Sequence, residues 1–270
     1  MSSFSDYSES GFLSVFSEFQ LALSKEGLPF DSNLAKGNKR TGVRWDATRK
    51  ISIISIAFDS EFAEWMFNSH FEAGAGDRPE KRAETAWRLV LAHEKGHILM
   101  NQKCWSSRLN QDSENDRGKA LGIERKGLIA SRLDFHVRVA EEALCDTMML
   151  QEAQKMFGDG WKEVGKVLSK IRHAYSGRLP FHVGDRYSTW TAIDRMLEEG
   201  KIMDPFEAAR LAYGKSVEAT GLGKSLAIAV ASPFAKEPPR EIGERLLEMR
   251  RARLDGEETN VVPKVQEKFR

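Results

Sequence analysis

Apolar residues recur at helical spacing along most of the chain, which predicts a largely helical protein. Between Phe12 and Leu23 this spacing predicts a first helix. Lys50–Asp59 differs, because its isoleucines partly alternate with serines, a pattern typical of a β-strand. The strand could lie in the core or at a sheet edge, where it would bind an extended substrate. Further helices are expected over Phe62–Phe71, Trp161–Tyr175, Tyr187–Leu197, Asp204–Tyr213 and Glu237–Leu254, and loops over Asp31–Thr41 and Ser106–Gly118.

Two longer helices are expected on either side of the polar segment Ser106–Gly118. The first starts at Asp77-Arg78-Pro79-Glu80, where a capping Asp and an early Pro form a start signal, and it runs to Met100. The second spans Ser131–Phe157. Together the patterns predict an α+β fold, a mostly helical domain with a small β-sheet beside the first long helix. No repeat or linker is visible, so residues 1–255 are expected to form one domain and residues 256–270 a solvated tail.

Composition narrows the classes of function. Apolar residues make up 41% of the 270 residues, which is adequate for a core, and the net charge is only +1. That balance gives no support to a partner held by bulk charge, so neither nucleic acid nor a membrane surface is expected. No apolar run reaches the roughly 20 residues of a membrane span, and no secretory signal is visible, so we expect a cytoplasmic protein. The two cysteines are expected to be free thiols.

The first long helix carries the pattern His93-Glu94-Lys95-Gly96-His97, an HExxH motif. Residues four apart share one face of a helix, so both imidazoles can bind one Zn²⁺ at about 2.0–2.1 Å each. Glu94 can then reach a water on the metal and take its proton as general base. Lys95 departs from the extended form of the motif, which usually has an uncharged residue there. The alternative is a chance match on an ordinary core helix.

A catalytic zinc takes three protein ligands and leaves one position for water, so a further ligand is needed. The second long helix offers Glu142 and Asp146, four residues apart among apolar neighbours. Carboxylates in such surroundings are unfavourable unless they are paired or bind a metal. The alternative is that Glu142 and Asp146 form a solvated stripe on the helix surface. Glu141, one position earlier, is the other candidate for the third ligand on this helix. The remaining candidates are His70, His136, His173 and His182.

An HExxH helix followed by a helix with Glu142-x-x-x-Asp146 resembles the gluzincin metallopeptidases, in particular the M48-like, ImmA/IrrE-like and Lit-like minigluzincins. The resemblance covers about Trp87 to Leu150, with Cys145 where those families usually have Ala. It implies a zincin-like fold, with zinc held by His93, His97 and Glu142 and with Asp146 orienting the first imidazole. It also suggests, loosely, that His182 and Arg186 assist the transition state. The alternative for that pair is an ordinary loop histidine and a surface arginine.

These patterns together predict a zinc-dependent metallopeptidase that hydrolyses peptide bonds of an intracellular protein or peptide. The resemblance suggests a regulatory, stress-linked or phage-linked role. One alternative is a catalytically inactive zincin-like module that binds a protein. Another is a DNA-linked regulator, against which the near-neutral charge and the lack of a recognisable helix-turn-helix motif both count.

Overall fold

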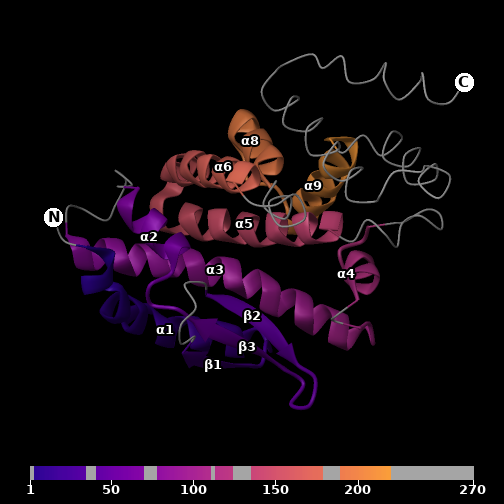
Figure 1. Ribbon diagram of the computed structural model, residues 1–270, viewed down its shortest axis with the longest axis horizontal. Helices are drawn as coiled ribbons and strands as arrows, with labels where there is room; N and C mark the ends of the chain where they lie inside the picture. The colour runs from indigo at the N-terminus through magenta and orange to yellow at the C-terminus, as the bar shows by residue number, and fades with distance from the viewer. Residues whose placement is uncertain are drawn as a thin grey trace, which may run out of the picture. The chain divides into compact units, whose positions relative to one another are not determined.

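The structure is a computed structural model that describes residues 3–34, 41–69, 78–110, 113–123, 135–178 and 189–219 (Figure 1). The chain divides into two units, Met1–Tyr213 and Gly214–Arg270. Both long helices that carry the predicted metal ligands belong to the first unit. The expected domain boundary at residue 255, the helix Glu237–Leu254 and the tail lie outside the described residues.

Helices dominate the described residues, and a small sheet accompanies them, consistent with the predicted α+β class. The strands are β1 (Phe30–Leu34), β2 (Gly42–Asp46) and β3 (Ile51–Ile56). The α-helices are α1 (Ser8–Lys25), α2 (Glu61–Asn68), α3 (Pro79–Ser106), α4 (Glu114–Ala120), α5 (Phe135–Phe157), α6 (Trp161–Arg178), α8 (Trp190–Glu199) and α9 (Pro205–Ala219). Short 3-10 helices are η1 (Phe4–Asp6) and η3 (Gly158–Gly160).

The three strands form one sheet in the order β1-β3-β2, with β1 parallel and β2 antiparallel to β3. The strand predicted over Lys50–Asp59 is confirmed as β3. It is the middle strand, and Ile54 on it is fully buried, so its interpretation as a substrate-binding edge is wrong. The loop expected over Asp31–Thr41 is also wrong in part, because its first residues pair with β3 as β1.

Helix α3 lies at the centre of the first unit and packs on α1, α2, α5 and the sheet. Figure 1 shows it running between the sheet and α5, with α6 on the far side of α5. A helix with neighbours on several sides must be apolar around much of its circumference. Trp87, Leu89, Val90, Leu91 and Ile98 are accordingly buried on it, which explains the apolar flanks on both sides of the HExxH motif.

The ends of the long helices differ from the predictions in detail. Pro79 occupies the first turn of α3 as predicted, but Arg78 takes the capping position and makes no side-chain cap hydrogen bond. The helix also continues past Met100 to Ser106, and α4 occupies part of the segment expected to be a loop. Gly158 ends α5 with a positive φ of 56°, as predicted, whereas Ser131 lies outside the described residues.

The two long helices meet at Gly96 of α3 and Cys145 of α5. A Cβ atom on Gly96 would lie 2.6 Å from Sγ of Cys145 and 2.9 Å from its Cα. Only glycine permits so close an approach without displacing the α5 backbone. The glycine inside the motif therefore has a packing role, and it brings the polar residues of both helices within reach of one another. Over the described residues, no helix has the length and apolar character needed to cross a membrane.

Candidate metal centre

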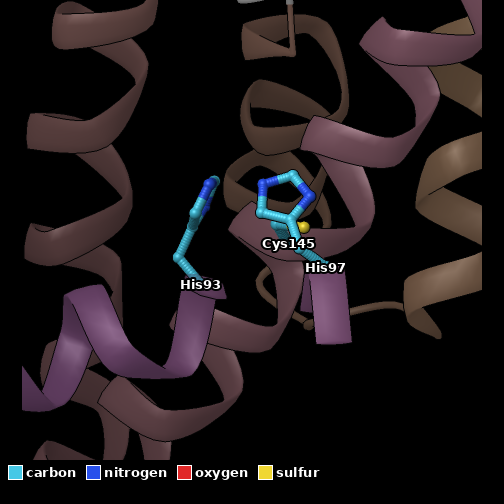
Figure 2. A group of neighbouring side chains, drawn as sticks. All are labelled: His93, His97 and Cys145. Carbon is cyan, nitrogen blue, oxygen red and sulfur yellow. The ribbon is translucent and has the colours of Figure 1, made fainter. Parts of the chain in front are cut away.

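His93 and His97 lie one turn apart on α3, and both rings project toward α5, with their centroids 5.2 Å apart (Figure 2). The side chain of His93 is only 6% exposed and that of His97 18%. Burying two imidazoles in a protein core requires partners for all four ring nitrogens. The positions of those nitrogens therefore define the chemistry of the site.

The Nδ1 atom of each ring faces a carboxylate on α5. His93 Nδ1 lies 3.0 Å from Asp146 Oδ1, and His97 Nδ1 lies 2.8 Å from Glu141 Oε1. An ionised carboxylate only accepts hydrogen bonds, so it holds the proton on Nδ1 and leaves the Nε2 lone pair of a neutral imidazole available. The same arrangement orients histidines that bind metals.

Both Nε2 atoms face the carboxylate of Glu142. Its Oε2 lies 3.4 Å from Nε2 of His93, and its Oε1 lies 3.7 Å from Nε2 of His97. The two distances run to different oxygens, so the carboxylate lies across both nitrogens, with one oxygen toward each. The structure thus brings Glu142 to the two available nitrogens, and it brings the rival Glu141 to the opposite nitrogen of His97.

Cys145 is a second candidate for the third donor. Together with His93 and His97 it forms a group whose potential ligand atoms lie within 4.8 Å of one another, and Figure 2 shows its sulfur close to the His97 ring. Zinc binds a thiolate. Burial, followed by the negative charges of carboxylates including Glu142, raises the pKa of the Cys145 thiol well above its usual value. A bound zinc would lower this pKa again, so Cys145 stays a possible donor. Glu142 is the donor proposed below because it is already ionised in the metal-free site: burial raises its pKa, but the hydrogen bond to His93 and the charges of His97, His93 and Arg172 lower it overall.

Glu94 is buried beside the two histidines, and its Oε2 atom has no hydrogen-bond partner among the described residues. Burial raises the pKa of its carboxyl group, and the charges of His97 and His93 offset only part of this effect. An unpartnered buried carboxylate oxygen is unfavourable. A water molecule beside a cation held by the neighbouring donors would satisfy it, so the residues present fit a metal ion.

Arg172 of α6 fixes the carboxylate that orients His93. Its Nε donates to Asp146 Oδ2 at 2.8 Å, its Nη2 donates to Oδ1, and Thr189 Oγ1 donates to Oδ2 at 2.6 Å. Burial alone would raise the pKa of Asp146, but the charge of Arg172 and the hydrogen bond to His93 hold it far below its usual range. Arg172 Nη2 also lies 3.6 Å from Glu142 Oε2.

Arg117 of α4 fixes the carboxylate that orients His97. Its Nε donates to Glu141 Oε2 at 2.7 Å, and its Nη2 donates to Oε1. Burial raises the pKa of Glu141, but the charge of Arg117 and contacts with His97 outweigh it and keep the group ionised. Neither arginine belongs to a motif that can be recognised in the sequence. A signal existed for Arg172, which lies in the apolar stripe of its helix four residues after Leu168.

Two of the other candidate histidines contact aromatic rings away from α3, and the remaining candidates lie outside the described residues. His173 stacks on Trp190 with ring centroids 4.0 Å apart, and His136 packs edge-on against Tyr213 in a second apolar cluster. His70, His182 and Arg186 lie outside the described residues.

Lys95, the residue that departs from the usual motif, forms an ion pair with Glu26 at the end of α1. Its ammonium group is therefore paired with a carboxylate on a different helix from the one that carries Glu142.

No protein-family model matches the chain, and no curated protein or solved structure matches it significantly.

Proposed function

We propose that the chain is a zinc-dependent metallopeptidase of the gluzincin type, which hydrolyses peptide bonds of a cytoplasmic protein or peptide. In this proposal His93, His97 and Glu142 hold the metal. One observation carries it: Nε2 of both histidines faces Glu142, at 3.4 and 3.7 Å, while Nδ1 of each is held by another carboxylate.

When bound, zinc supplies Lewis acidity, which polarises a substrate carbonyl and makes water a nucleophile at neutral pH. Glu94 accepts the proton that the attacking water loses and donates it to the leaving amine. Burial, which raises the pKa of this carboxyl group in the metal-free site, also opposes the lowering that a bound cation would cause, so the carboxylate would remain a usable base. Glu94 lies on the same helix as both histidines, so its position relative to them is fixed.

Asp146 and Glu141 act on the histidines rather than on the substrate in this proposal. Each keeps one imidazole in the tautomer that leaves Nε2 available, and an arginine in turn keeps each carboxylate ionised. On the resemblance alone, His182 and Arg186 remain the proposed hydrogen-bond donors to the developing oxyanion.

Metal content and peptide hydrolysis of purified variants test the proposal. We expect about one zinc per chain in the wild type, largely lost in His93→Ala and in Glu142→Ala. Cys145→Ala is the matched control, because it removes the other candidate donor, and it should keep its zinc. Glu94→Gln should also keep its zinc, while cleavage of a synthetic peptide library, followed by mass spectrometry, should slow by about 10²- to 10⁴-fold.

Three outcomes would contradict parts of this assignment. Zinc retained in both His93→Ala and Glu142→Ala would show that these residues do not hold the metal. Zinc lost in Cys145→Ala and kept in Glu142→Ala would show that Cys145, and not Glu142, is the third ligand. Zinc bound as expected, with the same peptide products from wild type and Glu94→Gln, would favour the catalytically inactive binding module over the enzyme.

A further inference from the structure

We propose that Arg117 is a positioning residue of the metal centre, which holds the ligand His97 in place through Glu141. The inference rests on the proposed function, because it concerns the same site. Arg117 lies on α4, in the connection between the two long helices, where the sequence predicts only a surface loop. A segment without any metal ligand would then belong to the site.

The contact between Arg117 and Glu141 fixes the plane of the carboxylate. The guanidinium uses Nε and Nη2 to reach both carboxylate oxygens, a bidentate pairing that only arginine can form. Glu141 Oε1 is also the atom that faces Nδ1 of His97, at 2.8 Å. Rotation of the carboxylate would therefore turn or release the imidazole, and the arginine prevents that rotation.

The guanidinium is itself anchored from the sheet. Arg117 Nη1 donates to Oδ1 of Asn101 at 3.0 Å, and Asn101 Nδ2 donates to Oγ of Ser52 on β3 at 3.1 Å. Asn101 lies one turn after His97 on α3, and both Asn101 and Ser52 are buried. A continuous chain of polar contacts thus runs from the middle strand to the second histidine.

Local structure places α4 where Arg117 can make these contacts. Ser113 caps the helix by accepting a hydrogen bond from the Asp116 backbone, and Asp116 Oδ2 accepts from the backbone of Asn110 at 3.1 Å. Leu121, directly after the helix, is buried in an apolar cluster with Met100 and Cys104 of α3 and Leu144 of α5. Helix α4 therefore packs firmly on α3 and α5.

Burial distinguishes this pair from an ordinary surface ion pair. The side chains of Arg117 and Glu141 are 13% and 8% exposed, whereas Lys119 on the same helix is 56% exposed in its pair with Asp116. Exposed pairs contribute little and are screened by salt. Removal of Arg117 instead leaves a buried anion without the partner that orients it.

Zinc affinity measured by chelator competition at one pH tests this role. Arg117→Ala should weaken zinc binding by about 10- to 100-fold, the usual effect of removing a group that orients a ligand. Lys119→Ala, the matched control, should bind zinc like the wild type. The visible spectrum of the cobalt-substituted protein should change in Arg117→Ala and not in Lys119→Ala, because it reports ligand geometry independently of activity.

A double-mutant cycle shows whether Arg117 acts through Glu141. In a Glu141→Gln background, Arg117→Ala should cause no further loss of affinity, and a full additional loss would overturn the proposal. If Arg117→Ala fails to fold, Arg117→Gln combined with Glu141→Gln removes both charges. That protein should bind zinc as weakly as Glu141→Gln alone, and wild-type affinity would overturn the inference.

The same measurements separate this inference from the proposed function. If the wild type binds no zinc that depends on His93 and Glu142, the proposed function fails. If it does bind such zinc, and Arg117→Ala binds as tightly as Lys119→Ala, only the role of Arg117 fails.

Discussion

Oδ1 of Asp146 lies 3.0 Å from Nδ1 of His93, and the same carboxylate receives the guanidinium of Arg172 and the hydroxyl of Thr189. Asp146 is fully buried, so its charge is stabilised by these three groups and not by solvent. One side chain thus connects α3, α5, α6 and the start of α8. It serves both the stability of the fold and the orientation of the histidine.

Replacing Asp146 by Asn should therefore lower both stability and metal affinity. The amide keeps the shape but removes the charge that makes the closest ion pair with the buried Arg172, which should reduce the free energy of unfolding by about 3–5 kcal/mol. Zinc affinity should fall by about 10- to 100-fold. Urea unfolding of the metal-free protein and chelator competition measure the two effects. Asp194→Asn, at a partly exposed pair with Ser169, is the control and should change little. Equal effects of the two substitutions would contradict the argument.

Gly96→Ala should separate the two long helices. The added Cβ would meet Sγ and Cα of Cys145 at 2.6 and 2.9 Å, so either the helices move apart or the backbone strains. Overpacking of this kind lowers the free energy of unfolding by about 1–3 kcal/mol, and zinc affinity should fall with it because α5 carries Glu142.

Gly214→Ala is the matched control for this substitution. Gly214 is also helical, and a Cβ there meets nothing within 4 Å among the described residues. Alanine should stabilise that helix by about 0.5–1 kcal/mol. Urea unfolding distinguishes the two variants, and a stabilising effect of Gly96→Ala would refute the close packing.

The metal-free protein should lose stability as the pH rises above neutrality. Burial lowers the pKa of His93, but its hydrogen bonds and charge interactions with Asp146 and Glu142 outweigh burial and raise the pKa to about 10. A pKa raised on folding stabilises the fold fully below the unfolded value of 6.5, and this contribution is lost as the pH rises through about 10. Protons also compete with zinc for the imidazole, so zinc affinity should increase over the same range.

Unfolding midpoints of metal-free and zinc-loaded protein between about pH 7 and 10 check this behaviour. The zinc-loaded protein should show a weaker dependence, because the coordinated imidazole carries no proton on Nε2. His93→Gln should flatten the curve of the metal-free protein. A metal-free wild type that becomes more stable with rising pH would contradict the assignment.

Lys95→Gln should have little effect on either stability or metal binding. The ammonium of Lys95 pairs with Glu26 on α1, and Glu26 is half exposed. Such pairs contribute less than about 1 kcal/mol, so the unfolding midpoint should hardly move. Zinc affinity should equal that of the wild type, measured by the same chelator competition. A large change in affinity would show that Lys95 influences the metal site directly.

Periodicity predicted the helices, because each signal lies within one segment of the chain. The spacing of His93 and His97, and of Glu142 and Asp146, is equally local, so the sequence pointed to these four residues and the structure brings them together. Strand β1 was not predicted, because its Asp-Ser-Asn core favours turns and only pairing with β3 makes it a strand.

The arginines that complete the site depend on tertiary packing. Arg172 reaches Asp146 only because α6 packs on α5, and Arg117 reaches Glu141 only because α4 packs against both long helices. The polar surroundings of Arg117 carry no periodic signal that would separate it from a surface residue. The choice between Glu141 and Glu142 was likewise open in the sequence. It depends on which nitrogen each carboxylate faces, and that follows from the relative rotation of α3 and α5.

His93 is oriented by Asp146, and Asp146 is held by Arg172 of α6. Helix α6 follows all three proposed ligands in the sequence. A truncated chain ending before Trp161 would keep all three donors yet lack the cation beside Asp146. We therefore expect this truncated chain to bind zinc more weakly than the full chain, although no proposed ligand is missing from it.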